Sequence, residues 1–141
     1  MTRKEEKTEL IYKDESYAII GACFELYKDT GCGFHEPAYH ECLEIDLEFQ
    51  RNSFLSKPSQ TLQYRRRILI QTFNPDFVCY DKIILEIKAV SELCDEHRAQ
   101  VLNYLSATGC KLGLLVNFGH YPGMEYERLL PRTQEPVDLQ L

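Results

Sequence analysis

Three charged residues interrupt the two apolar runs of residues 74–90, and they constrain the fold more than any other feature of the chain. Asp76 lies in the first run, while Glu86 and Lys88 lie in the second. Short apolar runs bounded by polar residues are typical of buried β-strands. Burying an unpaired carboxylate costs on the order of several kcal/mol. We therefore expect these groups to pair with one another or to bind a cation, and our hypothesis is a metal site.

Strand geometry predicts how these charged side chains lie. A tight turn centred on Asp81 would set Asp76 opposite Glu86, and residues opposite each other on an antiparallel ladder have Cβ atoms about 5 Å apart. Side chains alternate along a strand, so Lys88 shares the face of Glu86 while Ile87 points to the other layer.

Length and composition indicate an ordinary globular protein. The 141 residues suit a single domain over residues 1–141, with loose ends at 1–10 and 131–141. No apolar run approaches the roughly 18 residues of a membrane span, and the charged start does not resemble a secretory signal. The six cysteines are scattered without a C-x-x-C pair, which favours free thiols. We expect a cytoplasmic protein with no membrane partner.

The order of predicted elements favours a mixed α/β fold. The expected elements are helices at 15–30, 37–51 and 91–108, strands at 54–64 and 68–73, the charged hairpin, and strands at 113–117 and 124–130. The helix after the hairpin would cross over to a strand that pairs in parallel with one hairpin strand. Helices on both faces would cover the sheet.

Apolar stripes predict which faces of the first two helices are buried. The first stripe is Tyr17, Ile20, Phe24 and Tyr27, widened by Ile19, Cys23 and Leu26. The second stripe is Ala38, Cys42, Ile45 and Phe49, broadened by Leu43 and Leu47. Both follow the helical period, so we expect these side chains to face the core.

A polar stripe runs along the predicted third helix. His97, Gln100 and Tyr104 recur at helical spacing on an otherwise apolar element, so they could line a site. The alternative is a hydrogen-bonded polar seam between this helix and the sheet, because buried polar groups usually bond internally. A lone histidine on a helix is more often a packed or solvent-edge residue than a catalytic one.

Three short motifs carry a resemblance. They stand here as Gly33-Phe34-His35-Glu36-Pro37-Ala38-Tyr39, as Pro75-Asp76 followed by Glu86-Ile87-Lys88, and as Gln100-Val101-Leu102-Asn103-Tyr104. In this order, they resemble the GxxExxY family of the PD-(D/E)XK nuclease superfamily over roughly residues 10–130. The chain departs from the family pattern at Arg65-Arg66-Arg67, where the family tends to have a glycine turn.

The resemblance implies a restriction-endonuclease-like core, with four strands flanked by helices, and a metal-dependent nuclease acting on DNA or RNA. Asp76 and Glu86 would hold Mg²⁺, with Mn²⁺ as a substitute, and the Ile87 carbonyl and Glu36 would complete the site. Lys88 would assist the attacking water.

In the same resemblance, Gln100 and Tyr104 would orient Lys88 or the substrate backbone. With Asp76, Glu86 and Lys88 they form the expected catalytic set.

Other readings of these residues stay open. Lys88 could simply neutralise the two buried carboxylates. Glu36 stands at the start of a helix, where a carboxylate also serves as a cap. Tyr39 is better explained by packing, and the three arginines at 65–67 either contact phosphates or form a solvated turn.

Two further functions also stay open. The net charge of −6 and the small size favour a non-catalytic nucleic-acid-binding or regulatory module. A hydrolase of another phosphoester is a third reading. A homodimer that cuts both strands is conceivable for a nuclease of this size, although no exposed stripe identifies an interface.

Overall fold

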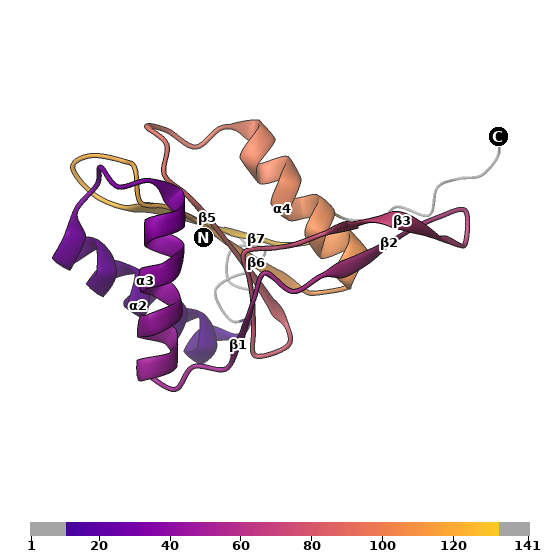
Figure 1. Cartoon of the computed structure of the whole chain (residues 1–141), viewed down its shortest axis with the longest axis horizontal. Helices are drawn as coiled ribbons and strands as arrows, with labels where there is room; N and C mark the ends of the chain where they lie inside the picture. The colour runs from indigo at the N-terminus through magenta and orange to yellow at the C-terminus, as the bar shows by residue number, and fades with distance from the viewer. Residues whose placement is uncertain (1–10, 133–141) are drawn as a thin grey trace, which may run out of the picture.

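A five-stranded mixed sheet organises the chain (Figure 1). The structure, a computed structural model, describes residues 11–132. Its elements are α2 (Lys13–Thr30), α3 (Glu36–Phe49), β1 (Phe54–Ser56), β2 (Gln60–Tyr64), β3 (Arg67–Phe73), β4 (Phe77–Cys79), β5 (Ile83–Lys88), α4 (Asp95–Thr108), β6 (Leu112–Asn117) and β7 (Glu125–Leu129). The predicted loose ends lie outside the described residues, apart from Pro131 and Arg132.

The β4–β5 hairpin has the predicted register. Cys79 pairs with Ile83, which centres the turn on Asp81 and brings Asp76 opposite Glu86. Both strands are buried except at the Lys88 end, so a slip by one residue would turn every side chain to the wrong face. Burial on both faces therefore fixes where the charged groups lie.

The crossover through α4 is also as predicted. β5 pairs in parallel with β6, while β7 adds an antiparallel strand at one edge. The sheet has the order β1-β4-β5-β6-β7, so it has five strands instead of four because β1 pairs with β4. Within residues 11–132, no helix combines the length and hydropathy needed to cross a membrane.

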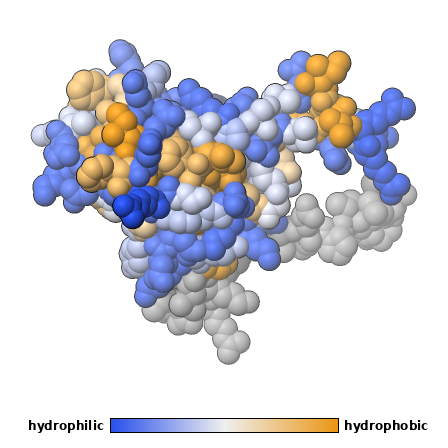
Figure 2. Space-filling model, turned by 60° about the horizontal axis from the view of Figure 1, so that its bottom comes forward, coloured by the Kyte–Doolittle hydropathy of each residue, from blue (hydrophilic) through white to orange (hydrophobic). Residues whose placement is uncertain are grey.

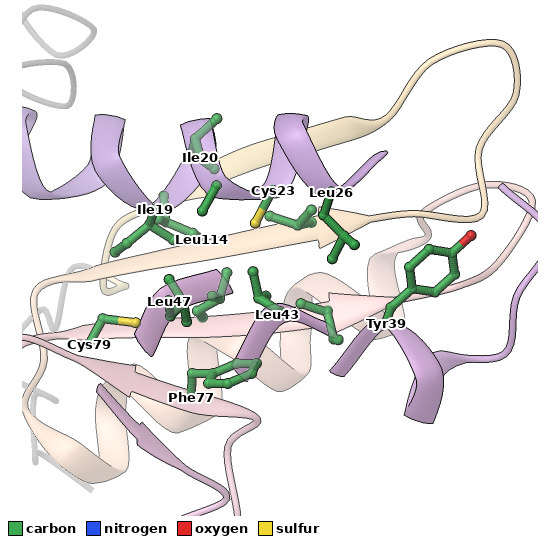
Figure 3. Close-up of a cluster of buried hydrophobic side chains, with 14 of the residues drawn as sticks. Ile19, Ile20, Cys23, Leu26, Tyr39, Leu43, Leu47, Phe77, Cys79 and Leu114 are labelled. Carbon is green, nitrogen blue, oxygen red and sulfur yellow. The ribbon is translucent and has the colours of Figure 1, made fainter. Parts of the chain in front are cut away.

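Helices cover both faces of this sheet. The larger hydrophobic cluster joins α2 and α3 to one face, and Figure 3 shows its side chains gathered between the helices and strands. Val101 and Leu105 of α4 pack on the other face against Ile84 and Leu115. Glu86 and Lys88 share the parity of Ile84, so they point to the α4 side.

The predicted buried faces of α2 and α3 are partly wrong. Tyr17 and Phe24 are 66% and 46% exposed, and Ile45 and Phe49 are 61% and 86% exposed. Of the other predicted residues, Ile19, Ile20, Cys23, Leu26, Leu43 and Leu47 are buried as expected, and Tyr39 and His40 of α3 join them. Each helix carries two overlapping apolar stripes, and periodicity alone does not say which one meets the sheet.

The expected long strand at 54–64 is split in two. Among residues 11–132, β1 joins the main sheet, whereas β2 turns away and pairs only with β3, giving a two-stranded ribbon that projects from the body (Figure 1). We call β2, β3 and their turn, residues 60–73, the arm. The break falls at residues 57–59 around Pro58, which cannot donate a ladder hydrogen bond.

A buried asparagine holds the loop between β5 and α4. Asn117 accepts hydrogen bonds from the N–H groups of Val90 and Gly119, both at 3.0 Å, and donates to the Val90 carbonyl at 2.9 Å. It also donates to Glu125 Oε1 at 2.9 Å, and the same oxygen accepts from Leu93 N–H at 3.0 Å. This network fixes the end of β5 relative to the start of α4.

We predict that Gly119→Ala destabilises the protein, because a Cβ at this position would lie 2.4 Å from the Val90 nitrogen and 2.5 Å from its oxygen. Main-chain atoms cannot rotate away, and overpacking of this kind costs about 1–3 kcal/mol. Urea unfolding measures the loss. Gly21→Ala is the matched control, since nothing lies within 4 Å of that position on α2. Equal denaturation midpoints for both variants would contradict the close approach.

Candidate functional site

Asp76 and Glu86 exchange hydrogen bonds with the main chain at the open end of the hairpin. The Asp76 N–H donates to Glu86 Oε1 at 2.6 Å, and the Ile87 N–H donates to Asp76 Oδ2 at 2.9 Å. The two carboxylates thus continue the ladder where main-chain pairing ends. Each uses one oxygen in this way, and the two carboxyl groups also lie within hydrogen-bond reach of each other.

The pKa of Glu86 is strongly raised. It is only 4% exposed, and burial, followed by the charge of Asp76, raises its pKa to about 8. Lys88 opposes this shift, but less strongly. A cation between the carboxylates would relieve both the desolvation of Glu86 and its repulsion by Asp76.

Lys88 is held by the α4 residues that the sequence placed beside it. Its Nζ donates to Gln100 Oε1 at 3.0 Å, and Gln100 Nε2 donates to the Tyr104 hydroxyl at 3.0 Å. The Tyr104 ring stacks on Phe73 at the base of the arm, with centroids 4.9 Å apart. In the described part of the chain, Lys88 forms no ion pair with either carboxylate, so a salt-bridged core is not what holds it.

Glu36 approaches the same region from another element. It is the first residue of α3 and is partly buried. Burial raises its pKa, the charge of Asp76 raises it further, and Lys88 lowers it, so its carboxyl lies within the field of these two groups. No side chain caps this helix by a hydrogen bond.

His40 belongs to the site and was missed in the sequence. Its ring is 5% exposed and stacks on Phe77, while Nε2 lies 2.8 Å from Ser56 Oγ. Nδ1 lies 3.7 Å from Asp76 Oδ1 and has no hydrogen-bond partner. Burial lowers the pKa of His40, which favours the neutral imidazole. The available signal was its spacing of four from Glu36, which puts both on one face of α3.

Other residues considered in the sequence lie outside the site. His97 accepts a hydrogen bond from Cys94 N–H at 3.1 Å and caps α4. Tyr39 is a packing residue, as expected: its ring stacks on Phe118, and its hydroxyl donates to the Gly31 carbonyl at 2.6 Å. The arginines at 65–67 lie at the turn of the arm.

The site offers oxygen ligands but few side chains. Among residues 11–132, no group of three or more His, Cys, Asp or Glu side chains is arranged to hold a metal ion. Asp76 and Glu86 place two carboxyl groups side by side at this end of the hairpin, each with one oxygen bonded to the main chain. A strand residue directs its N–H and C=O to the same neighbour, so the Ile87 carbonyl faces the side on which Asp76 lies. Carboxylate and carbonyl oxygens suit a hard divalent cation.

Two features define a restriction-endonuclease-like core. One is the mixed sheet with helices on both faces, and the other is the group of Asp76, Glu86 and Lys88 at the end of its hairpin. A family model described as the PD-(D/E)XK nuclease superfamily matches residues 13–129, and the chain belongs to this superfamily. Nucleases of this superfamily typically use divalent metals.

A solved structure described as "Crystal structure of SSO0001" is similar in fold, with a TM-score of 0.55 and 15% sequence identity. The alignment covers 93% of this chain and 64% of that chain, so this protein spans less than two thirds of its solved relative. Comparison with curated proteins found no match.

We predict that, without divalent metal, the free energy of unfolding falls as the pH rises from about 4.5 to about 8. The folded protein retains the Glu86 proton over this window, because the pKa is raised from 4.5 to about 8, whereas the unfolded chain releases it. One such group contributes a slope of at most about 1.4 kcal/mol per pH unit. Glu86→Gln should remove most of this slope in urea unfolding across the pH series. An unchanged slope would show that Glu86 ionises normally in the folded protein.

Proposed function

We propose that this protein is a metal-dependent nuclease that hydrolyses phosphodiester bonds in nucleic acid, with Mg²⁺ as its metal and Mn²⁺ as a substitute. One observation carries the proposal. Asp76 and Glu86 each give one oxygen to the main chain and hold their carboxyl groups against each other at the end of the hairpin, with Lys88 held on the same side of the sheet. Membership of the nuclease superfamily supports the same reaction.

In this proposal Asp76, Glu86 and the Ile87 carbonyl hold the metal, and Glu36 contributes through a bound water. When bound, the metal supplies positive charge to the scissile phosphate and lowers the pKa of a coordinated water. The raised pKa of Glu86 supports this assignment, because a buried carboxyl beside Asp76 is stabilised in its ionised form by a cation. His40 faces Asp76 Oδ1 and orients that carboxylate from behind.

Lys88 assists the attacking water and stabilises the negative charge that develops on the phosphate. Its hydrogen bond to Gln100 fixes the ammonium group, and Tyr104 fixes Gln100 in turn. Tyr104 accepts the Gln100 hydrogen bond, so its own hydroxyl proton is available to donate to a substrate oxygen.

We further assign the chain to the GxxExxY family as a single domain. The position of Glu36 beside Asp76 supports the family assignment, because it gives the central residue of that motif a place near the site. The six cysteines are all free, which supports a cytoplasmic location.

A non-catalytic module is the second candidate, and one observation favours it. A Glu86 whose pKa is about 8 is largely protonated at neutral pH, and a neutral Glu86 needs no metal. Such a protein would bind no divalent cation through Asp76 and would not turn over nucleic acid.

We predict that Asp76→Asn abolishes both Mn²⁺ binding and cleavage. Asparagine keeps an oxygen for the Ile87 N–H but loses the charge that a cation requires. Calorimetric titration measures binding, and incubation with single- and double-stranded DNA and RNA measures cleavage. Lys88→Met should bind Mn²⁺ normally yet cleave about 100- to 1000-fold more slowly. Exposed Lys111→Met serves as the charge-matched control.

The nuclease proposal fails if the wild-type protein leaves all four substrates intact with Mg²⁺ and Mn²⁺, or if Asp76→Asn cleaves at the wild-type rate. Absence of Mn²⁺ binding in the wild type would instead support the non-catalytic module.

Tyr104→Phe provides a finer prediction. The variant keeps the ring that stacks on Phe73 but removes the hydroxyl that accepts from Gln100. We expect kcat to fall about tenfold, a range typical of one lost positioning hydrogen bond of about 1.4 kcal/mol. Mn²⁺ affinity and the urea midpoint should stay near wild type. A normal kcat would assign Tyr104 to packing alone.

A further inference from the structure

The arm has a charge unlike the rest of the protein. The arm and the three residues that precede it, residues 57–73, contain four basic residues and no acidic residue, in a chain whose net charge is −6. The other residues of the chain therefore carry a net negative charge larger than 6 in magnitude. Three of the four are consecutive, Arg65, Arg66 and Arg67, and within residues 11–132 none of these three forms an ion pair.

The arginines occupy the tip of the ribbon at a conformational cost. Tyr64 pairs with Arg67 across a two-residue turn, and Arg65 and Arg66 have φ angles of 50° and 64°. This left-handed region costs a residue other than glycine about 1 kcal/mol or more. Asn-Gly is the preferred pair in such turns. The tip therefore holds two charged side chains where the backbone favours small, uncharged ones.

Aliphatic side chains are exposed directly behind this tip. Ile68 and Ile70 alternate along β3, so they share one face, and they are 67% and 96% exposed. Figure 2 shows hydrophobic and hydrophilic groups side by side on the projecting arm. Exposed aliphatic groups beside unpaired positive charge indicate a surface that contacts a partner.

The arm leads directly into the site. β3 ends at Phe73, which stacks on Tyr104, and the chain then reaches Asp76. At about 3.3 Å per residue, the chain from Arg67 to Asp76 spans up to about 30 Å. The phosphates of one strand of a duplex repeat about every 3.4 Å along the helix axis, so this distance corresponds to about nine base pairs along the axis. A duplex that has one phosphate at Asp76 and runs along the arm would therefore reach the tip of the arm almost one helical turn from that phosphate.

We propose that the arm is a DNA-binding ribbon that enters the major groove of double-stranded DNA about one turn from the cleaved bond. Arg65, Arg66 and Arg67 contact phosphates, and Ile68 and Ile70 contact thymine methyl groups. The position relative to the cleaved bond rests on the proposed nuclease function, whereas binding by the arm does not.

Groove dimensions favour DNA over RNA. The DNA major groove is about 12 Å wide and admits a two-stranded ribbon, whereas the RNA major groove is too narrow for side chains to read. The basic tip is complementary to a polyanion. It is also complementary to the acidic body of a second copy, and the experiment separates these two occupants.

The test removes charge from the tip without removing the arm. Arg65→Asn, Arg66→Gly and Arg67→Gln are combined in one variant, because Asn-Gly suits the positive φ angles of the turn. The control combines Lys28→Gln, Arg51→Gly and Lys111→Gln. It removes three exposed charges from the body, including one from Arg51, which also has a positive φ of 60°.

Fluorescence anisotropy with a chelator present measures binding to 30-base-pair and 8-base-pair DNA duplexes and to a 30-base-pair RNA duplex, at increasing salt. Each lost phosphate contact lowers the slope of log affinity against log salt by about 0.9. On the long DNA duplex, we expect the magnitude of this slope to be smaller by about 2 to 3 for the arm variant than for the wild type. We expect little change on the short duplex or on RNA, and a change below about 1 for the control.

The proposal is overturned if the arm variant and the control have equal slopes, if the wild type does not bind the long DNA duplex, or if RNA binding depends on the arm to the same degree. Light scattering that finds a wild-type dimer and a monomeric arm variant would instead assign the arm to contact between copies. Arm-dependent DNA binding without metal-dependent cleavage would refute the nuclease function and leave the binding surface standing.

Discussion

The exchange of hydrogen bonds between Asp76, Glu86 and the neighbouring main chain is the interaction on which the rest of the structure depends. It extends the hairpin beyond its last main-chain pair and thereby aligns both carboxylates. The Asp76 carbonyl also accepts from Lys57 N–H at 2.8 Å, at the point where the chain leaves the sheet for the arm. His40 faces the other oxygen of Asp76 from α3. One residue thus joins the central hairpin, the base of the arm and a helix on the opposite layer.

The buried Glu86 carboxyl lowers the stability of the fold, whereas the proposed chemistry requires it. A hydrophobic residue in place of Glu86 would avoid the desolvation that raises its pKa to about 8. The fold accommodates the acid because main-chain donors satisfy one oxygen of each carboxyl group, whereas the buried strands around Glu86 cause the desolvation. Lys88 is kept apart from the carboxylates by its bond to Gln100, so its charge stays available instead of being neutralised.

Strand alternation allowed the hairpin register to be predicted, and the order of the elements allowed the parallel crossover to be predicted. The grouping of Lys88 with Gln100 and Tyr104 followed from the resemblance to the nuclease family. The sequence predicted the buried faces of the first two helices only in part, because Phe49 and Ile45 looked as suitable for the core as Leu43. That choice depends on tertiary packing. His40 escaped notice because a buried polar residue has no apolar pattern to mark it. The strands of the arm were expected, but not their departure from the sheet, which follows from the break near Pro58.

The same arm has a consequence for how copies of the protein behave toward one another. β3 pairs only with β2 among the described residues, so its outer edge presents open main-chain groups beside Ile68, Leu69 and Ile70. An exposed apolar edge of this kind is a template for strand addition and aggregation. The adjacent arginines act as gatekeepers, because two approaching tips carry like charge. This protection is electrostatic and not steric, so it weakens as salt shortens the screening length, to about 10 Å at 0.1 M.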